Sequence, residues 1–300
     1  MAGTPPFPSP TKRWHSKAQP VTSPTRPELS AKGKSVIITG GGTTGIGGET
    51  ARYFAEAGAS RIALLGRREA PLLDNKAFIE NKFPGVEVFT MSTDVTKQSD
   101  VNAAFAQFAG DGTINVLVHS AATVGPKEPV AEADGDAYLD AIQKNISSSF
   151  WLAQAFLRHA APDAVAIIIS SWAAHWSVNE AFSSYCVSKM AMFRLWDTVG
   201  LANPNLSVFH TQPGVVLTEM NKKIGGAASM EEVQMDVPID DVSLPASFNL
   251  WLASPEARFL RGKFLWCNWD VEELKAQAKE LEEGTKLNIG LVGWPFADAS

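Results

Sequence analysis

The stretch SVIITGGGTTGIG, residues 35–47, decides the fold of this chain. Its apolar, β-branched start, Ser35 to Thr39, predicts a strand buried on both faces, and the pattern over residues 50–57 predicts a helix directly after the glycine-rich turn. In such a unit, backbone N–H groups and the helix N-terminus face the turn, where glycines permit close approach of an anion. The glycines could simply form a tight turn, but their setting between strand and helix favours a site for the pyrophosphate of a dinucleotide.

The rest of the chain continues this alternation of strands and helices. Apolar runs predict further strands at Arg61–Leu65, Val86–Met91, Ile114–Val118, Ala164–Ile169, Leu206–His210 and Phe264–Cys267. Helical patterns lie over Asp100–Phe108, Ala137–Ala160, the stretch that starts at Tyr185, Val242–Leu252 and Val271–Leu281. Because parallel strands need crossovers that cover both faces of the sheet, this order predicts an α/β fold with one Rossmann-type, doubly wound parallel sheet over residues 33–268.

Three segments lie outside this alternation. Residues 1–32 form a Pro-rich arm that cannot make a core by itself; Phe7 and Trp14 could pin it to the domain, or it could be a disordered tail. Residues 219–240 are rich in Gly, Met and acidic residues and follow a strand end, so we interpret them as a mobile substrate lid, with a plain surface insertion as the alternative. Residues 269–300 carry the charged C-terminal helix and a tail, in which Trp294 and Phe296 could pack at a subunit contact or over the pocket.

Composition argues against several classes of function. The 300 residues are 45% hydrophobic, enough for a core, and a net charge of −6 with a pI near 5.5 argues against a nucleic-acid partner. No apolar run approaches the roughly 20 residues of a membrane-spanning helix, so no membrane partner is expected. Two cysteines and five scattered histidines match no metal site or disulfide framework, and the arm lacks the apolar core of a secretory signal. We therefore expect a reducing, cytoplasmic location and no metal.

A second constellation follows the strand at Ala164–Ile169. That strand carries Ser170 and Ser171 to its C-terminal end, the edge where open α/β sheets bind ligands. Tyr185 and Lys189 are four residues apart at the start of a helix and so share one of its faces. A nearby ammonium favours the phenolate of a tyrosine, whose pKa is ordinarily about 10, and a serine hydroxyl can bind a carbonyl or alkoxide oxygen. Tyr-x-x-x-Lys alone is a common spacing, so an ordinary helix pair with a chance serine upstream is the alternative.

The end of the second strand indicates which cofactor binds. It reads Gly66-Arg67-Arg68, whereas an NAD site usually places Asp or Glu there to hold the ribose 2′-hydroxyl. An arginine at this position accommodates a 2′-phosphate, so NADP, as NADPH, is favoured. The alternative is a solvated basic turn that Glu69 partly offsets.

One polar residue interrupts the apolar face of the helix over Ala137–Ala160. Asn145 lies among Ile142, Ile146 and Phe150, and an asparagine buried in such a place needs hydrogen-bond partners. A structural role and a role in catalysis are both open.

Together these residues resemble the short-chain dehydrogenase/reductase family. The resemblance covers about residues 33–268 and rests on an ordered set: the turn Gly41–Gly47, Asp94, Asn145, Ser171, Tyr185, Lys189, and Pro213-Gly214 with Thr218. The sequences SPTRPEL at 23–29 and WCNWD at 266–270 are similar to fungal members, many of which serve secondary metabolism. The resemblance implies a homodimer or homotetramer built partly on the helices of Asn145 and Tyr185.

The resemblance also implies a catalytic tetrad of Ser171, Tyr185, Lys189 and Asn145. In it Tyr185 exchanges the proton with the substrate oxygen and Ser171 orients that oxygen. Lys189 binds the nicotinamide ribose and lowers the pKa of Tyr185, and Asn145 holds a water that relays protons to Lys189. Asp94 and Val95 are implied to contact the adenine, and Thr218 the carboxamide or phosphate side. The candidate cofactor-binding residues, from the turn, the second strand and the resemblance, are Gly41, Thr43, Thr44, Gly45, Ile46, Gly47, Arg67, Arg68, Asp94, Val95, Ser120, Ala121, Ala122, Tyr185, Lys189, Pro213, Gly214, Val216 and Thr218.

Three features depart from the family pattern. The turn has one residue more than the usual Thr-Gly-x-x-x-Gly-x-Gly between Thr39-Gly40 and Gly45, so phosphate contacts could be rearranged. The sequence His119-Ser120-Ala121-Ala122 replaces the usual Asn-Asn-Ala-Gly, which affects the adenosine-ribose contact and the support of the sheet. The loop from Ser171 to Tyr185 is slightly long, which leaves Ser170 as the alternative serine.

The sequence thus predicts an NADP-dependent oxidoreductase that reduces a ketone or oxidises the matching secondary alcohol. Trp172, Trp176, Phe182 and Met220 predict a pocket for a bulky apolar or aromatic, polyketide-like metabolite, although these aromatic side chains could instead pack the core or a subunit interface. One alternative is a non-redox enzyme of the same fold, a dehydratase, isomerase or cyclase that uses Tyr185 as acid and base. The other is a non-catalytic NADP-binding sensor.

Overall fold

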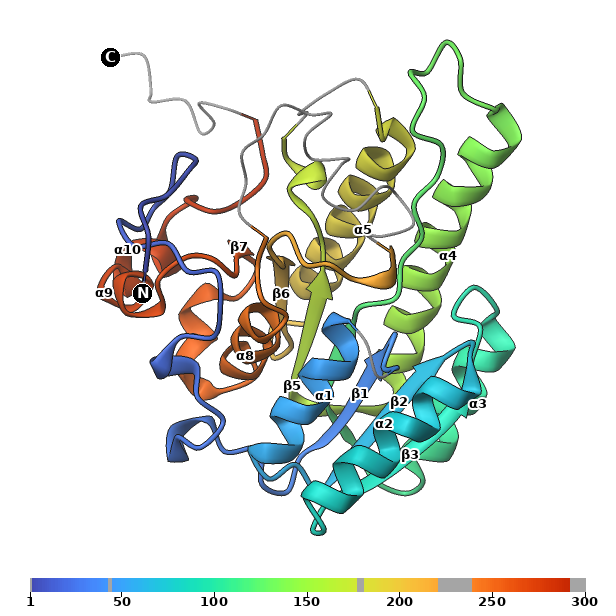
Figure 1. Ribbon diagram of the computed structural model, residues 1–300, viewed down its shortest axis with the longest axis vertical. Helices are drawn as coiled ribbons and strands as arrows, with labels where there is room; N and C mark the ends of the chain where they lie inside the picture. The colour runs from blue at the N-terminus through green and yellow to red at the C-terminus, as the bar shows by residue number, and fades with distance from the viewer. Residues whose placement is uncertain (1, 43–44, 177–180, 221–238, 292–300) are drawn as a thin grey trace.

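Within residues 2–42, 45–176, 181–220 and 239–291, which the computed structural model describes, seven parallel strands form one sheet in the order β3-β2-β1-β4-β5-β6-β7 (Figure 1). The strands are β1 (Ser35–Thr39), β2 (Arg61–Gly66), β3 (Glu87–Ser92), β4 (Ile114–His119), β5 (Ala160–Ile169), β6 (Ser207–Gln212) and β7 (Phe264–Trp266). The strand order reverses between β1 and β4, the point at which doubly wound sheets bind ligands. The predicted α/β fold with a Rossmann-type, doubly wound sheet is confirmed.

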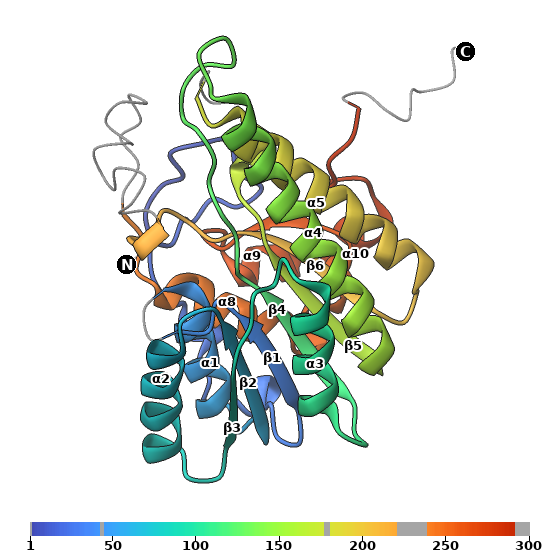
Figure 2. The same ribbon diagram turned by 90° about the vertical axis from the view of Figure 1, so that its right-hand side faces the viewer.

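Helices cover both faces of the sheet (Figure 2). One face carries α1 (Ile46–Glu56), α2 (Glu69–Lys82) and α8 (Ser243–Leu252), and the other carries α3 (Gln98–Ala109), α4 (Gly135–His159) and α5 (Ser183–Ala202). The alternation of side chains along β1 explains the two cores. Ile38 belongs to the same buried cluster as Phe54 of α1, and its neighbour Ile37 to the same cluster as Phe105 of α3. The strand β1 therefore presents apolar side chains to both faces of the sheet, as a strand covered by helices on both sides requires.

Two helices differ from the prediction in more than the residues at which they begin or end. The helix α2 was not predicted, because it leaves Leu73 and Phe78 exposed and so lacks a clear apolar stripe. The prediction of one continuous helix over Val271–Leu281 is wrong: α9 (Val271–Ala276) ends at Gln277, whose φ of −103° and ψ of 11° are not helical, and α10 (Ala278–Glu283) follows. At this break the Gln277 side chain donates hydrogen bonds to Pro10 O and Glu273 O.

The Pro-rich arm packs on the domain. It contains the short 3₁₀ helices η1 (Pro20–Thr22) and η2 (Pro27–Leu29). The arm runs beside α8 and α9, which lie near the other end of the sequence (Figure 1). Trp14 is buried, and isolated bridges join it to Gly3 and to Trp269. Of the two alternatives for residues 1–32, the packed arm is the one found over its described residues.

Some predicted features fall outside the described residues. These are most of the lid, residues 221–238, the turn residues Thr43 and Thr44, the stretch 177–180 and the tail that holds Trp294 and Phe296. In the part of the chain that is described, no helix is long and apolar enough to cross a membrane. Over the same residues, no three His, Cys, Asp or Glu side chains gather in a group that could hold a metal ion.

Candidate active site

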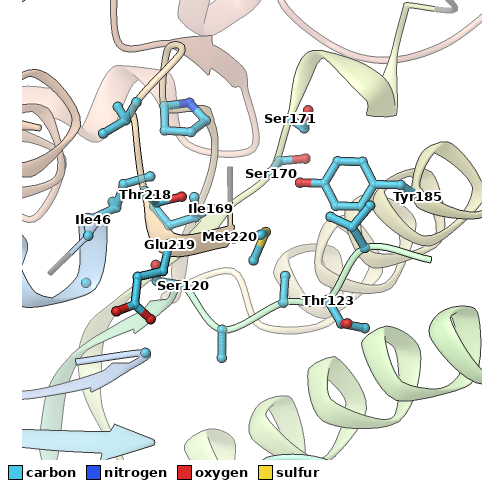
Figure 3. Close-up of a pocket in the computed structure, with 18 of the residues that line it drawn as sticks. Ile46, Ser120, Thr123, Ile169, Ser170, Ser171, Tyr185, Thr218, Glu219 and Met220 are labelled. Atoms are coloured by element: carbon cyan, nitrogen blue, oxygen red, sulfur yellow. The ribbon is translucent and has the colours of Figure 1, made fainter. Parts of the chain in front are cut away.

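A cavity of about 860 Å³ lies at the C-terminal ends of the strands, where the loops that follow β1, β4, β5 and β6 meet. Figure 3 shows Ile46, Thr218 and Glu219 on one side of it and Ser171 and Tyr185 on the other, with Met220 between them in this view. The two constellations found in the sequence, the glycine-rich turn and the Ser-Tyr-Lys set, therefore line one cavity. This arrangement places a nucleotide site and an acid–base site next to each other.

Ser171, Tyr185 and Lys189 all line this cavity, as their spacing predicted. The ammonium of Lys189 lies 5.4 Å from the centre of the Tyr185 ring, and it donates a hydrogen bond of 2.8 Å to the carbonyl oxygen of Ile169. The Tyr185 hydroxyl is hydrogen-bonded to Ser171, and Figure 3 shows it directed toward Ser170 and Ser171. The helix α5 thus presents a phenol and an ammonium to the end of β5.

Burial decides the protonation of this set. It raises the pKa of Tyr185 to about 12, against the smaller lowering effect of the hydrogen bond to Ser171. Burial also lowers the pKa of Lys189 to about 8. In this structure the pKa of Tyr185 therefore moves opposite to the effect expected of a nearby ammonium. At neutral pH the site holds a neutral phenol, which can donate a proton, and a lysine that is still mostly charged.

The two serines differ in their partners. Ser171 caps the short 3₁₀ helix η3 (Trp172–Ala174), where its hydroxyl oxygen accepts a hydrogen bond from Ala173 N at 3.3 Å. Ser170 also lines the cavity and is buried, and its hydroxyl has no hydrogen-bond partner among the described residues. Both hydroxyls are therefore available at the tyrosine, and Ser171 is the one bonded to it.

Asn145 does not line the cavity; it supports a loop that does. The residue is buried in α4, where Oδ1 accepts from Thr123 N and Nδ2 donates to Thr123 O, both at 2.9 Å. Thr123 lies in the loop after β4 and lines the cavity. The asparagine thus uses both halves of its amide to fix the backbone of that loop.

Glycines permit a close approach between β1 and α1 at the described part of the turn. Gly40 and Gly45 have φ values of 71° and 108°, which favour glycine. A Cβ on Gly47 would lie 2.5 Å from the carbonyl oxygen of Gly40, so α1 can approach β1 this closely only without a side chain. Gly40, Gly42, Gly45 and Gly47 line the cavity at the N-terminus of α1, so the pyrophosphate site that the sequence predicts would lie there.

The two arginines after β2 both line the cavity but have different partners. Arg68 forms an ion pair of 2.6 Å with Glu219, which follows β6 in the chain. Burial raises the pKa of the Asp94 carboxyl, but two hydrogen bonds from Thr96, together with the nearby Arg67 and Lys97, bring it below its usual value. The carboxylate of Asp94 is turned to Thr96 and does not line the cavity. Arg67 is thus the better-placed cation for a phosphate.

The loop that follows His119, where the sequence departs from the family pattern, is fixed by a threonine of β1. Thr39 Oγ1 accepts hydrogen bonds of 3.1 Å from both Ser120 N and Ala121 N, and so fixes the loop after β4. Its own hydrogen is then directed to Nδ1 of His119, 3.4 Å away. Burial lowers the pKa of His119 to about 3, so the imidazole is neutral. Thr39 of β1 therefore fixes the backbone of the loop that follows His119.

Two residues that position the site were not singled out from the sequence. Gln212, at the end of β6, accepts a hydrogen bond of 2.8 Å from Trp172 N through its side-chain oxygen. Asp240 accepts hydrogen bonds from Val215 N at 2.8 Å and Asn268 Nδ2 at 3.0 Å, and burial raises its pKa to about 6 against the effect of these donors. The position of Gln212 at a strand's C-terminal end could have been a signal. Nothing in the sequence around Asp240 indicates its partners.

Most of the other predicted residues line the cavity. Apart from those already described, these are Ile46, Val95, Ala122, Pro213, Gly214, Val216, Thr218, Trp172, Phe182 and Met220. Gly41 and Trp176 do not line it: the carbonyl of Gly41 accepts from Asn75, and the Trp176 ring packs edge-on against Phe7. Thr43 and Thr44 lie outside the described residues.

Comparisons with known proteins agree with this geometry. A family model described as short chain dehydrogenase matches residues 34–228. A short chain dehydrogenase/reductase of Claviceps purpurea (strain 20.1) is 34% identical over 291 residues, which cover 95% of each chain. The short chain dehydrogenase/reductase AacuD of Aspergillus aculeatus is 31% identical and covers 95% of this chain and 98% of its own. Among solved structures, a short chain dehydrogenase from Burkholderia cenocepacia J2315 in complex with NADP has a TM-score of 0.70 at 23% identity and covers 79% of this chain and 96% of that one, a likeness of fold.

Proposed function

The chain belongs to the short-chain dehydrogenase/reductase family, and on that premise we propose that it is an NADPH-dependent ketone reductase, or the matching secondary-alcohol dehydrogenase. The observation that carries the proposal is the common cavity, which Ser171, Tyr185 and Lys189 line together with glycines of the turn at the N-terminus of α1. When bound, NADPH supplies the hydride.

The protonated tyrosine favours the direction of reduction. A ketone that accepts a hydride develops negative charge on its oxygen and needs a proton. With a pKa of about 12, the Tyr185 hydroxyl carries that proton at neutral pH, and Ser171 hydrogen-bonds the same oxygen in the proposed pose. Lys189 is proposed to hold the nicotinamide ribose and, as a cation, to stabilise Tyr185 after its proton has left. Asn145 completes the proposed tetrad by fixing the loop at Thr123.

A preference for NADPH over NADH is proposed from the end of β2. Gly66 offers no carboxylate for a ribose 2′-hydroxyl, and Arg67 lines the cavity directly after it. The Arg68 guanidinium already pairs with Glu219, so we assign the 2′-phosphate to Arg67. Arg67→Ala should weaken NADPH at least about tenfold more than NADH, since a charge-assisted phosphate contact is worth roughly 1.5–3 kcal/mol. Equal weakening of both cofactors in fluorescence titrations would remove this assignment.

The proposed substrate is a bulky apolar or aromatic ketone of the kind found among polyketide-like secondary metabolites. Trp172, Phe182 and Met220 line the same cavity as Tyr185. Phe182 has a φ of 62°, a strained value for an aromatic residue, which the fold retains at the start of α5 next to the proposed acid. An apolar lining around one hydroxyl pair suits a large ring system with a single reacting oxygen.

The decisive experiment compares the wild type with Tyr185→Phe. We would titrate both with NADPH and then follow loss of 340 nm absorbance with aromatic ketones such as 1-tetralone. The variant should bind NADPH as the wild type does and lose about 10²–10⁴-fold in kcat, the usual contribution of a general acid. Normal turnover by the variant would sink the tyrosine assignment. Tight NADPH binding with no oxidation by any ketone would move the proposal to a non-redox enzyme or a sensor.

We also propose that the protein forms a homodimer or homotetramer through α4 and α5 and works in the cytoplasm. Exposed apolar side chains recur along α4 at Leu139, Ile146, Phe150 and Leu157, and α5 adds Val187 and Met190. Such stripes on two packed helices are typical of subunit interfaces. Light scattering after size exclusion should give a multiple of 32.3 kDa, and Phe150→Glu should reduce it. The free thiols Cys186 and Cys267 support a reducing location.

A further inference from the structure

We infer that the N-terminal arm, residues 2–30, is a positioning element of the substrate site, in which Phe7 holds Trp172 against the cavity. The inference rests on the proposed function in one respect, that the cavity is a substrate site. The contacts of the arm are observed independently of that proposal. No residue of the arm lines the cavity, so the arm would act through the residues it touches. Phe7 is accordingly a positioning residue.

The arm is fastened along its length by contacts that residues of a loose tail would not make. Trp14 is 5% exposed, and Gln19 binds the backbone on both sides of Asp270: its side-chain nitrogen donates to Trp269 O and its oxygen accepts from Val271 N. Farther along, Thr22 bonds Ser247 in α8, and Arg26 pairs with Glu256 at 2.8 Å. The arm is therefore held in place on the domain from Trp14 to Arg26.

Phe7 stands at the centre of an aromatic cluster, which we define as Phe7, Trp14, Trp172, Trp176 and Trp266. Its ring lies 6.0 Å from Trp172, 5.2 Å from Trp176 and 5.7 Å from Trp266, centre to centre, each in an edge-on arrangement. Edge-on pairs at these distances are favourable beyond their buried area. Trp172, which directly follows Ser171, lines the cavity. Its backbone N–H donates a hydrogen bond to the side-chain oxygen of Gln212. Phe7 thus covers the outer side of a residue whose other surface faces the site.

A second path leads from the arm to the cofactor side of the cavity. The Asn268 side chain donates hydrogen bonds to His15 O of the arm at 2.8 Å and to Asp240 Oδ1 at 3.0 Å. Asp240 in turn accepts from Val215 N at 2.8 Å, next to Pro213 and Gly214 in the cavity wall. The arm therefore supports two walls of the same cavity, one near Ser171 and one near the proposed nicotinamide end.

The test separates positioning from general stability by hydrogen exchange on the full chain. The amides of Ala174, His175 and Trp176 bond back to Ser171 and Trp172, and so they report the order of the cavity wall that Phe7 covers. In Phe7→Ala these amides should exchange about tenfold faster. Each edge-on aromatic pair contributes about 0.5–1.5 kcal/mol, and a loss of about 1.4 kcal/mol corresponds to that factor. Phe7→Leu keeps apolar cover but loses the edge-on pairs, so it should restore only part of the protection.

The matched control is Phe78→Ala. Phe78 is a half-exposed residue of α2, and its ring packs under Arg52 of α1. This variant should leave the amides of residues 174–176 unchanged. With 1-tetralone and NADPH, Phe7→Ala should raise KM about tenfold and change the dissociation constant for NADPH less than about twofold, while Phe78→Ala changes neither. Faster exchange throughout the chain in Phe7→Ala, including α2, would overturn positioning in favour of overall stability, as would behaviour identical to the control.

The two proposals fail separately. A wild type that reduces no ketone refutes the proposed reaction, and the exchange at residues 174–176 still decides whether the arm orders this wall. A wild type that reduces 1-tetralone, with a Phe7→Ala variant unchanged in both exchange and KM, leaves the reaction standing and refutes the role of the arm.

Discussion

Replacing Asn145 with alanine distinguishes a loop anchor from a direct participant in proton transfer. The side chain is 1% exposed and makes two hydrogen bonds of 2.9 Å to the backbone of Thr123. Each net bond is worth about 1 kcal/mol, and each partner left partly buried adds to the cost, so the free energy of unfolding should fall by about 2–3 kcal/mol. For a chain of this size that corresponds to a Tm lower by roughly 3–5 °C.

The assay is urea unfolding of the ligand-free protein, followed by KM and kcat with 1-tetralone. Because Thr123 lines the cavity, we expect KM to rise together with the loss of stability. The control is Asn102→Ala, which removes a surface hydrogen bond of 3.3 Å from Arg158 and should change the unfolding free energy by less than about 0.5 kcal/mol. An Asn145→Ala variant with normal stability and a lost kcat would refute the anchor and favour a role in the proton relay.

The remaining predictions concern the nucleotide turn and a buried carboxyl. The Cβ of Gly47→Ala would lie 2.5 Å from Gly40 O, so this variant should lose about 1–3 kcal/mol of stability and bind NADPH about 10- to 100-fold more weakly. Gly135→Ala, whose Cβ would have open space, is the control and should change neither. Tight NADPH binding by Gly47→Ala in a fluorescence titration would contradict the proposed site. The pKa of Asp240 rises from 3.8 to about 6 on folding, so its ionisation opposes folding: relative to Asp240→Asn, the wild type should lose up to about 3 kcal/mol of stability between pH 4 and pH 7. A difference that is flat with pH in urea titrations would show that this carboxyl does not titrate as inferred.

The sequence alone was sufficient for the fold and for the main members of the site. The strand β1 was predicted over Ser35–Thr39 and is found there. A parallel strand buried on both faces is a continuous apolar run, and here the glycine-rich turn marks its end. Ser171, Tyr185 and Lys189 could be placed together because helical spacing and the end of a strand are local properties. Where the local pattern was weak, as in α2 with its exposed Leu73 and Phe78, the element was missed.

Tertiary structure decided what the side chains contact and which of them are charged. The amide of Asn145 has only donors and acceptors to offer, and the sequence could not say that both bond Thr123 across 22 residues. The pKa of Tyr185 depends on burial, which outweighs the neighbouring groups and is set by packing from several loops. The contacts of Phe7 with Trp172 and of His15 with Asn268 join positions more than 160 residues apart. Local pattern fixes which elements form, because each depends on its own few residues, whereas partners and pKa values depend on residues that only the folded chain brings together.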